Sequence, residues 1–126
     1  MTIIYQHRIY RKDLKANPSI IYLFGDNEAR AGYGGQAKEC RGEPNAVGIA
    51  TKRAPSRAHD AYWSDDDYDR CAAIIRSDFE PVITHWKSNG LIIVPSDGLG
   101  TGLSELPTRA PRLLSLIETT IKSLTC

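Results

Sequence analysis

Four short apolar runs, separated by polar and glycine-rich segments, dominate the hydrophobic pattern of this 126-residue chain. Residues 2–10 are rich in β-branched and aromatic side chains, and residues 20–24, 46–51 and 91–94 are short, almost uninterrupted apolar segments. Runs of this length are typical of strands that are buried on both faces of a parallel sheet. The pattern therefore predicts four strands.

Helical periodicity occupies the longer stretches between these runs. One helix is predicted over about residues 34–41, and a last one over about residues 108–124. The acidic segment 64–67 suits the start of a long helix, which Asn-Gly at 89–90 ends. Pro81 lies within this helical pattern, so it must kink the helix or begin a second one.

The order of the predicted elements is strand, strand, helix, strand, helix, strand, helix. Strands that alternate with helices favour an α/β fold, here a compact three-layer α/β/α sandwich. A chain of 126 residues is long enough for a single domain over residues 1–126 and too short for two. In such folds ligands bind beyond the carboxyl ends of the strands. The glycine-rich or polar segments 25–35, 51–56 and 96–105 are predicted to lie there.

Composition and charge narrow the classes of function. Apolar residues make up 41% of the chain and charged residues 25%, as in an ordinary soluble globular domain. A formal net charge of +1 argues against strong general binding to nucleic acid. No segment approaches the roughly 18 apolar residues that span a bilayer, and the N-terminus lacks the apolar core of a signal peptide. We expect a monomeric cytoplasmic protein with no membrane partner.

The cysteines and histidines do not form a pattern that binds metal. Cys40, Cys71 and Cys126 are odd in number and widely spaced, which favours reduced thiols over a disulfide framework or a zinc site. The three histidines also lack the spacing of metal ligands. We predict no metal site and no cofactor.

The most informative segment is the glycine-rich loop that follows the last predicted strand. Its glycines stand at alternate positions, so the backbone can adopt positive φ and its N–H groups can converge on one point. Convergent N–H groups at the end of a strand form a cradle for an anion, most often a phosphate. The candidate ligand-binding residues in this loop are Ser96, Asp97, Gly98, Leu99, Gly100, Thr101, Gly102, Leu103 and Ser104.

A second glycine-rich loop follows the strand at 20–24. Two such loops after two strands suggest a cleft built for a nucleotide diphosphate, although glycines also serve close packing of a strand against a helix. Asp26 and Asn27 suit adenine or the ribose hydroxyls, or one of them caps the next turn. The candidate binding residues here are Gly25, Asp26, Asn27, Gly32, Tyr33, Gly34, Gly35 and Gln36.

Titratable side chains accompany these loops. Thr51 and Lys52 directly follow the strand at 46–51, where a lysine could neutralise a phosphate or act on a sugar carbon. A solvated basic patch is the alternative interpretation of Lys52. Glu105 could serve as a general base, or it is an ordinary surface glutamate. Three aromatic side chains could stack on an adenine or simply pack against their neighbours: Tyr33, Tyr62 and Trp63.

Three segments together resemble the macrodomain family, which binds ADP-ribose in a cleft of a three-layer α/β sandwich. The first is Phe-Gly-Asp-Asn at 24–27 with Gly-Tyr-Gly-Gly-Gln-Ala at 32–37. The second is Ile-Ala-Thr-Lys-Arg-Ala-Pro-Ser at 49–56, and the third is Val-Pro-Ser-Asp-Gly-Leu-Gly-Thr-Gly-Leu-Ser-Glu-Leu at 94–106. They are most similar to the branch of terminal ADP-ribose glycohydrolases and DNA-ADP-ribose antitoxins, within a compact, phage-associated subgroup.

The resemblance implies that the chain binds ADP-ribose, or an ADP-ribosyl group on a protein or nucleic acid, in the cytoplasm of a phage host. Lys52 matches a lysine that is catalytic in some members of that branch, so it would act on the anomeric carbon, with Glu105 or Asp26 as the base. The branch has an acid directly after Gly-Leu, where this chain has Ser104. Two alternatives therefore stay open. One is a non-catalytic module that sequesters an NAD-derived signal, and the other is a structural or protein-interaction domain.

Overall fold

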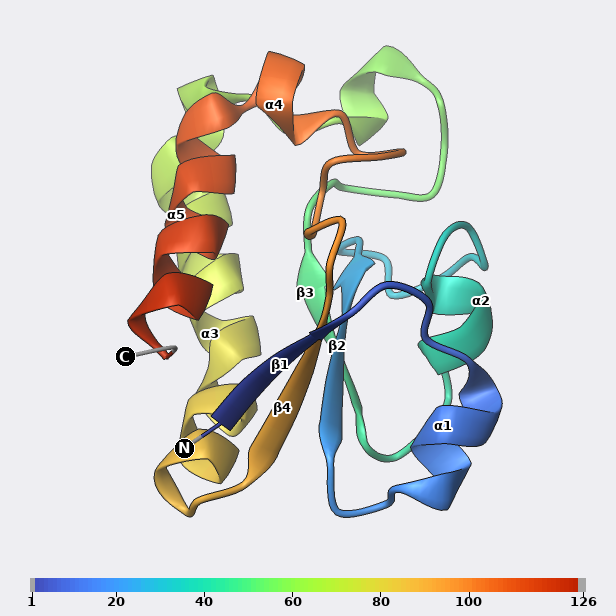
Figure 1. Cartoon of the computed structure of the whole chain (residues 1–126). Coiled ribbons are helices and arrows are strands. Elements are labelled where there is room, and N and C mark those ends of the chain that lie inside the picture. Colours follow the sequence, from blue (N-terminus) through green and yellow to red (C-terminus); the bar gives the residue numbers. More distant parts are fainter. Residues whose placement is uncertain (1, 125–126) are drawn as a thin grey trace.

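The computed structural model describes residues 2–124 and contains one four-stranded parallel sheet (Figure 1). The strands are β1 (Thr2–Gln6), β2 (Ile21–Asp26), β3 (Ala46–Ala50) and β4 (Leu91–Pro95). Their order in the sheet is β1-β4-β2-β3, and each neighbouring pair is parallel. The predicted α/β class is confirmed, and all four predicted strands are present.

Helices connect these strands along the chain. They are α1 (Arg11–Ala16), α2 (Ala37–Cys40), α3 (Tyr68–Lys87), α4 (Leu106–Arg109) and α5 (Pro111–Ser123). Two short 3-10 turns, η1 (His59–Ala61) and η2 (Asp65–Asp67), precede α3.

Helices pack against both faces of the sheet. In Figure 1, α3 and α5 stand on one side of the strands, and α1 and α2 stand on the other. The buried side chains form two clusters that match this arrangement. Along β2, Leu23 belongs to the cluster with α3 and α5, whereas Tyr22 and Phe24 belong to the cluster with α1 and α2. This alternation explains why β2 is apolar at successive positions.

The long helix α3 follows the predicted periodicity but passes through its proline. Its buried residues lie on one helical face: Cys71, Ala72, Ile75, Phe79 and Val82. Pro81 lies inside this helix. Residues 68–87 therefore form one helix, and Pro81 does not begin a second one. The apolar face on both sides of Pro81 packs into the same core, and this burial offsets the backbone hydrogen bond that proline cannot donate.

Three helical segments differ from the predictions. The helix predicted over about residues 34–41 is limited to α2 at Ala37–Cys40. Residues 7–10 were expected to continue β1, but the strand ends at Gln6 and α1 begins at Arg11, where the Asp13 carboxylate accepts the N–H of Tyr10 at 2.9 Å. Leu14 is the only buried residue of α1, so this helix has no apolar periodicity to reveal it. The helix predicted over residues 108–124 is divided into α4 and α5 at Ala110, which has ψ of 66°.

Two of the cysteines are buried free thiols, as predicted for reduced cysteines. Cys40 and Cys71 form no disulfide. Burial raises the pKa of the Cys40 thiol to about 12 and that of Cys71 to about 11. Cys126 lies outside the described residues. Both buried thiols are therefore protonated at neutral pH and contribute to packing.

Candidate functional site

The candidate site lies where the chain leaves β2 and β4 in opposite directions. These strands are neighbours in the sheet, but β2 continues toward α2 on one face and β4 toward α4 and α5 on the other. Diverging connections at the carboxyl ends of adjacent parallel strands open a crevice. A cavity of about 630 Å³ occupies this position. Its volume lies within the usual range for pockets that bind small molecules.

The segments that follow β2, β3 and β4 line this cavity together. Every residue named from the sequence as a candidate for binding, stacking or catalysis lies on its wall, with the exceptions of Ser96 and Trp63. Ser96 is exposed, and its hydroxyl lies 3.5 Å from Nδ1 of His7. The wall also includes residues that were not named as candidates, from loops and from the ends of α2 and β4: His7, Ala31, Ala37, Arg41, Pro55, Ser56, Arg57 and Pro95.

The aromatic candidates divide between the cavity and the core. Tyr33 is 68% exposed and lies on the cavity wall, as does Tyr62. Trp63 is buried in the core beside α3, and its indole N–H donates to Glu28 at 2.7 Å. Trp63 is thus placed for packing and not for stacking on a ligand.

The loop after β4 presents six successive backbone N–H groups without a protein acceptor. Amides 99–104 donate no hydrogen bond to any residue within 2–124, whereas Gly98 donates to Pro95 and Glu105 donates to Gly102. Positive φ values of 88° at Gly98 and 79° at Gly100 bend the backbone here. All six residues line the cavity. Leu99 and Ser104 are buried, whereas residues 101–103 are exposed to solvent. Successive N–H groups without a protein acceptor are suited to bind an anion.

The loop after β2 has the same property. Amides 32–36 donate to no acceptor among the described residues, and Gly32 and Gly35 have φ of 91° and 56°. A Cβ atom added to Gly34 would lie 2.7 Å from Cδ1 of Leu103, so the two loops touch across the cavity. The two amide runs therefore converge on one space.

Asp26 and Asn27 shape the first loop through their side chains. The Asp26 side chain is 4% exposed and forms ion pairs with Arg41 at 2.6 Å and with Arg30 at 3.5 Å. It also accepts the N–H of Asn27 at 2.8 Å. The Asn27 amide donates to the carbonyl of Ala31 at 2.8 Å. These contacts match the turn-capping alternative considered for these residues, and two arginines and a backbone N–H already contact the Asp26 carboxylate.

A chain of hydroxyl groups joins the ends of β2 and β3 to the loop after β4. Thr51 Oγ1 donates to the carbonyl of Asp26 at 2.9 Å and lies 2.5 Å from Ser104 Oγ. Because threonine has one hydroxyl proton, the Ser104 hydroxyl must be the donor to Thr51. Ser104 is buried. This serine therefore anchors the second amide run to the residue that follows β3.

Lys52 is a buried cation on the cavity wall. It is 7% exposed, and its Nζ donates to the carbonyl of Ser56 at 2.8 Å. Nζ also lies 4.1 Å from the centroid of the Tyr62 ring. The salt bridges within residues 2–124 do not include Lys52. A carbonyl oxygen and an aromatic face thus hold its ammonium group.

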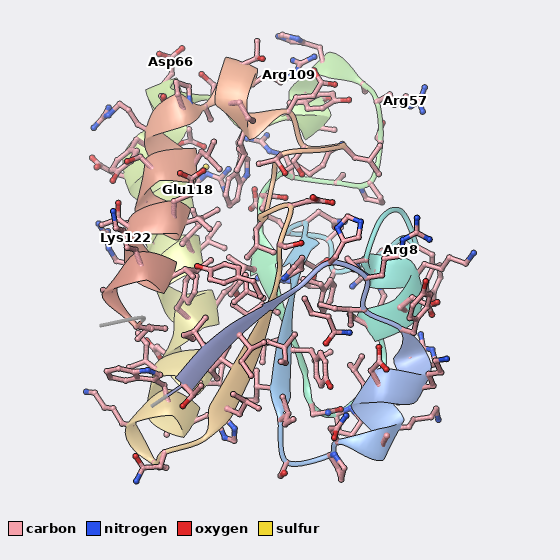
Figure 2. All side chains as sticks on the ribbon, in the orientation of Figure 1. Arg8, Arg57, Asp66, Arg109, Glu118 and Lys122 are labelled. Carbon is pink, nitrogen blue, oxygen red and sulfur yellow. The ribbon has the colours of Figure 1, made fainter. Side chains whose placement is uncertain are left out.

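Desolvation lowers the pKa of Lys52. Burial is the main cause, the nearby Glu105 carboxylate opposes it, and the charges of Arg109 and Arg57 lower the pKa further. Figure 2 shows Arg109 on α4 and Arg57 on the loop after β3, both beyond the carboxyl ends of the strands. At a given pH, a larger fraction of Lys52 is therefore in the neutral amine form than of an ordinary surface lysine.

Glu105 occupies an unusual position beside this lysine. It has φ of 53°, in the left-handed region, and precedes the first residue of α4. Its carboxylate is 49% exposed and bonds to Arg109 at 3.1 Å, and the Arg109 guanidinium lies 3.7 Å from the Tyr62 centroid. Glu105 thus reaches the Lys52 end of the cavity while it remains open to solvent.

Comparison with known families adds one result. The chain belongs to a family of unknown function, DUF7831. The match covers residues 4–120, which include every residue that lines the cavity. No curated protein and no solved structure matches the chain.

Two further observations concern metals and membranes. Within residues 2–124, no three histidine, cysteine, aspartate or glutamate side chains are grouped so that they could hold a metal ion. In the same part of the chain, no helix combines the length and the hydropathy that crossing a bilayer requires.

Proposed function

We propose that this protein binds ADP-ribose, or an ADP-ribosyl group carried by a protein or nucleic acid, within a compact fold of the macrodomain type. The observation that carries the proposal is the pair of unpaired amide runs, 32–36 and 99–104, which face one cavity. Two anion cradles side by side suit the two phosphates of a diphosphate better than a single phosphate. The similarity of three sequence segments to macrodomains supports the same ligand.

The remaining wall suits the two ends of such a ligand. Tyr33 offers an exposed aromatic face at one part of the wall, where an adenine could stack. Lys52 and Glu105 lie on the parts of the wall that follow β3 and β4. In the proposed complex, the anomeric carbon of the distal ribose lies beside them. The amides of both runs have no protein acceptor within residues 2–124, so a bound anion would not displace a hydrogen bond that they already donate.

Hydrolysis of the ADP-ribosyl linkage is a second candidate, and the environment of Lys52 favours it. In this scheme the neutral amine attacks the anomeric carbon, and the bond to the carrier breaks with its electron pair leaving on the carrier atom, which takes up a proton. Water then releases ADP-ribose and restores the amine. Since Arg41 and Arg30 hold the Asp26 carboxylate, Glu105 is the better base for these proton transfers.

The alternative of a non-catalytic module draws support from Ser104. This residue anchors a loop through its hydroxyl where a catalytic acid would stand, and Glu105 is paired with Arg109. Binding of ADP-ribose without any release from an ADP-ribosylated carrier would establish this alternative.

Calorimetric titration with ADP-ribose, with AMP and NAD as comparison ligands, tests the proposal. We expect ADP-ribose to bind more tightly than AMP, because ADP-ribose supplies a diphosphate to both amide runs whereas AMP has a single phosphate. Release of ADP-ribose from a modified protein or oligonucleotide is then measured separately. If folded protein binds none of the three ligands, the proposal fails and the interaction-domain alternative remains.

A further inference from the structure

The side chain of Arg41 ties the first amide loop to the sheet. This residue follows α2 directly, and its side chain is 15% exposed. Its Nε donates to the carbonyl of Gly32 at 2.8 Å, and its Nη2 donates to the carbonyl of Ala31 at 3.1 Å. The same Nη2 donates to Asp26 Oδ1 at 2.6 Å at the end of β2. One guanidinium thus holds two successive loop carbonyls and one strand-end carboxylate.

This contact sets the direction of the loop amides. In a planar trans peptide, the C=O and N–H groups point in opposite directions. Because the carbonyls of residues 31 and 32 point at the Arg41 guanidinium, the N–H groups of residues 32 and 33 point away from it. Those two N–H groups begin the run of amides that have no acceptor within residues 2–124.

Gln36 holds the opposite end of the same loop. Its side-chain Nε2 donates to the carbonyl of Ile9 at 3.0 Å, and its Oε1 accepts the N–H of Ile9 at 3.3 Å. The loop is therefore held at both ends by side chains, while its own amides 32–36 stay unpaired.

We propose that Arg41 is the positioning residue of the first amide loop, with Asp26 as the carboxylate that orients its guanidinium. The role of Asp26 is then to fix the loop and not to accept a proton from a substrate. This inference concerns the architecture of the loop, and its consequence for ligand affinity rests on the proposed function.

A simpler role for Arg41 would be to balance the charge of buried Asp26. The two roles predict different behaviour for the double variant D26N/R41Q, which removes both charges. If charge balance is all that matters, the double variant keeps the wild-type loop. If the guanidinium positions the loop through the carbonyls of residues 31 and 32, the double variant loses the loop geometry although no buried charge is left unpaired. The variant R41K adds a second comparison, because lysine keeps the charge but not the planar fork.

The first measurement is a set of amide NMR spectra of the ligand-free protein, with R11Q as the control. Arg11 bonds to Glu43 at 3.0 Å and to the backbone carbonyls of Lys38 and Arg41, so it also binds α2 but not the loop at 31–36. We expect D26N/R41Q and R41K to shift the amide signals of residues 31–36 and to leave those of residues 99–104 unchanged. R11Q leaves both sets unchanged. Wild-type signals at residues 31–36 in D26N/R41Q would overturn the inference.

The second measurement is titration of the same variants with ADP-ribose and with inorganic pyrophosphate. We expect an affinity loss of about tenfold or more for D26N/R41Q and R41K, and little loss for R11Q. Full affinity in D26N/R41Q would also overturn the inference. Absence of ligand binding in the wild type would refute the proposed function, while the NMR spectra would still decide the role of Arg41.

Discussion

Lys52 acquires its chemical character from its surroundings. The sequence places it after a strand, where a solvated basic patch and a catalytic amine were both reasonable interpretations. In the structure it is 7% exposed and rests against the Tyr62 ring. Burial lowers its pKa, which a solvated lysine would not show. The observation excludes the solvated patch and leaves a role in the cavity.

If the protein is a hydrolase, replacing Lys52 by alanine removes turnover and spares most of the affinity for ADP-ribose. The amine reacts with the anomeric carbon, whereas the two amide runs supply most of the binding. Activity and calorimetric affinity are compared with those of K38A, which removes an exposed lysine of α2 outside the cavity. Equal loss of affinity and turnover in K52A would contradict the catalytic role.

The same reasoning gives a direction for the pH dependence of turnover. If the neutral amine of Lys52 acts as the nucleophile, as in the proposed hydrolysis, the rate rises with pH as Lys52 loses its proton. Since burial lowers the pKa of Lys52, this rise occurs at lower pH than for an ordinary lysine. A pH profile of kcat for the wild type tests this, and a rise only at the pH of a solvent-exposed lysine would contradict it.

At the scale of the element, the conformation of the loop between β4 and α4 requires glycine at position 100 but not at position 102. Gly100 has φ of 79°, and a Cβ atom there would collide with the side chain of buried Leu106. Gly102 does not have a positive φ, and a Cβ atom there would meet open space. The three alternating glycines of this loop are therefore not equivalent.

We predict that G100A lowers the free energy of unfolding by about 2–4 kcal/mol, from the left-handed backbone and the overpacking together. G102A is the matched control and changes it by less than about 0.5 kcal/mol. Urea denaturation measures both. A similar stability for the two variants would show that the loop does not hold Gly100 in this conformation.

The start of α5 depends on a residue far away in the sequence. Asp65 of η2 accepts the N–H groups of Arg112 at 2.9 Å and Leu113 at 3.2 Å. Its carboxylate thus caps α5, which begins at Pro111, far from Asp65 in the chain. The acidic segment 64–67 was predicted to start α3, and the structure adds this second role.

We expect D65A to destabilise the protein by about 1 kcal/mol, the usual contribution of a helix cap. D66A serves as the control, because Asp66 is exposed and its carboxylate bonds to no residue within 2–124 (Figure 2). Thermal unfolding followed by circular dichroism compares the two. Equal destabilisation by both changes would indicate a general effect of acidic charge and not a cap.

At the scale of the whole molecule, the sheet separates two hydrophobic cores of unequal size. The larger core lies between the sheet and α3 with α5, and the smaller one lies between the sheet and α1 with α2. Phe79 lies in the larger core and is 1% exposed. Ile4, on edge strand β1, is 44% exposed.

Truncation of Phe79 to alanine is expected to lower the free energy of unfolding by about 3–5 kcal/mol, because the change leaves a cavity in the larger core. I4A removes an apolar side chain that is already largely in water and costs less than about 1 kcal/mol. Chemical denaturation followed by the fluorescence of Trp63 and Trp86, which both contact the larger core, measures both. A small effect of F79A would mean that α3 can repack against the sheet without this side chain.

Local sequence was sufficient to predict most of the fold. Apolar runs of four to six residues located β2, β3 and β4, because adjacent residues of a buried strand are all apolar. The β-branched and aromatic residues within 2–10 located β1. The helix α1 escaped prediction because only Leu14 is buried on it. The glycine spacing indicated both amide loops, since positive φ is a property of single residues.

The tertiary structure decided which polar side chains remain available in the cavity. Arg41 is 15 residues from Asp26 in the chain, and Ser104 is 53 residues from Thr51, yet both pairs are bonded. Such contacts depend on the order of the strands and on the path of each loop across their ends, and neither leaves a periodic signal in the sequence. The sequence therefore located the loops of the site, whereas only the folded chain showed that Asp26 holds a loop and that Lys52 is buried.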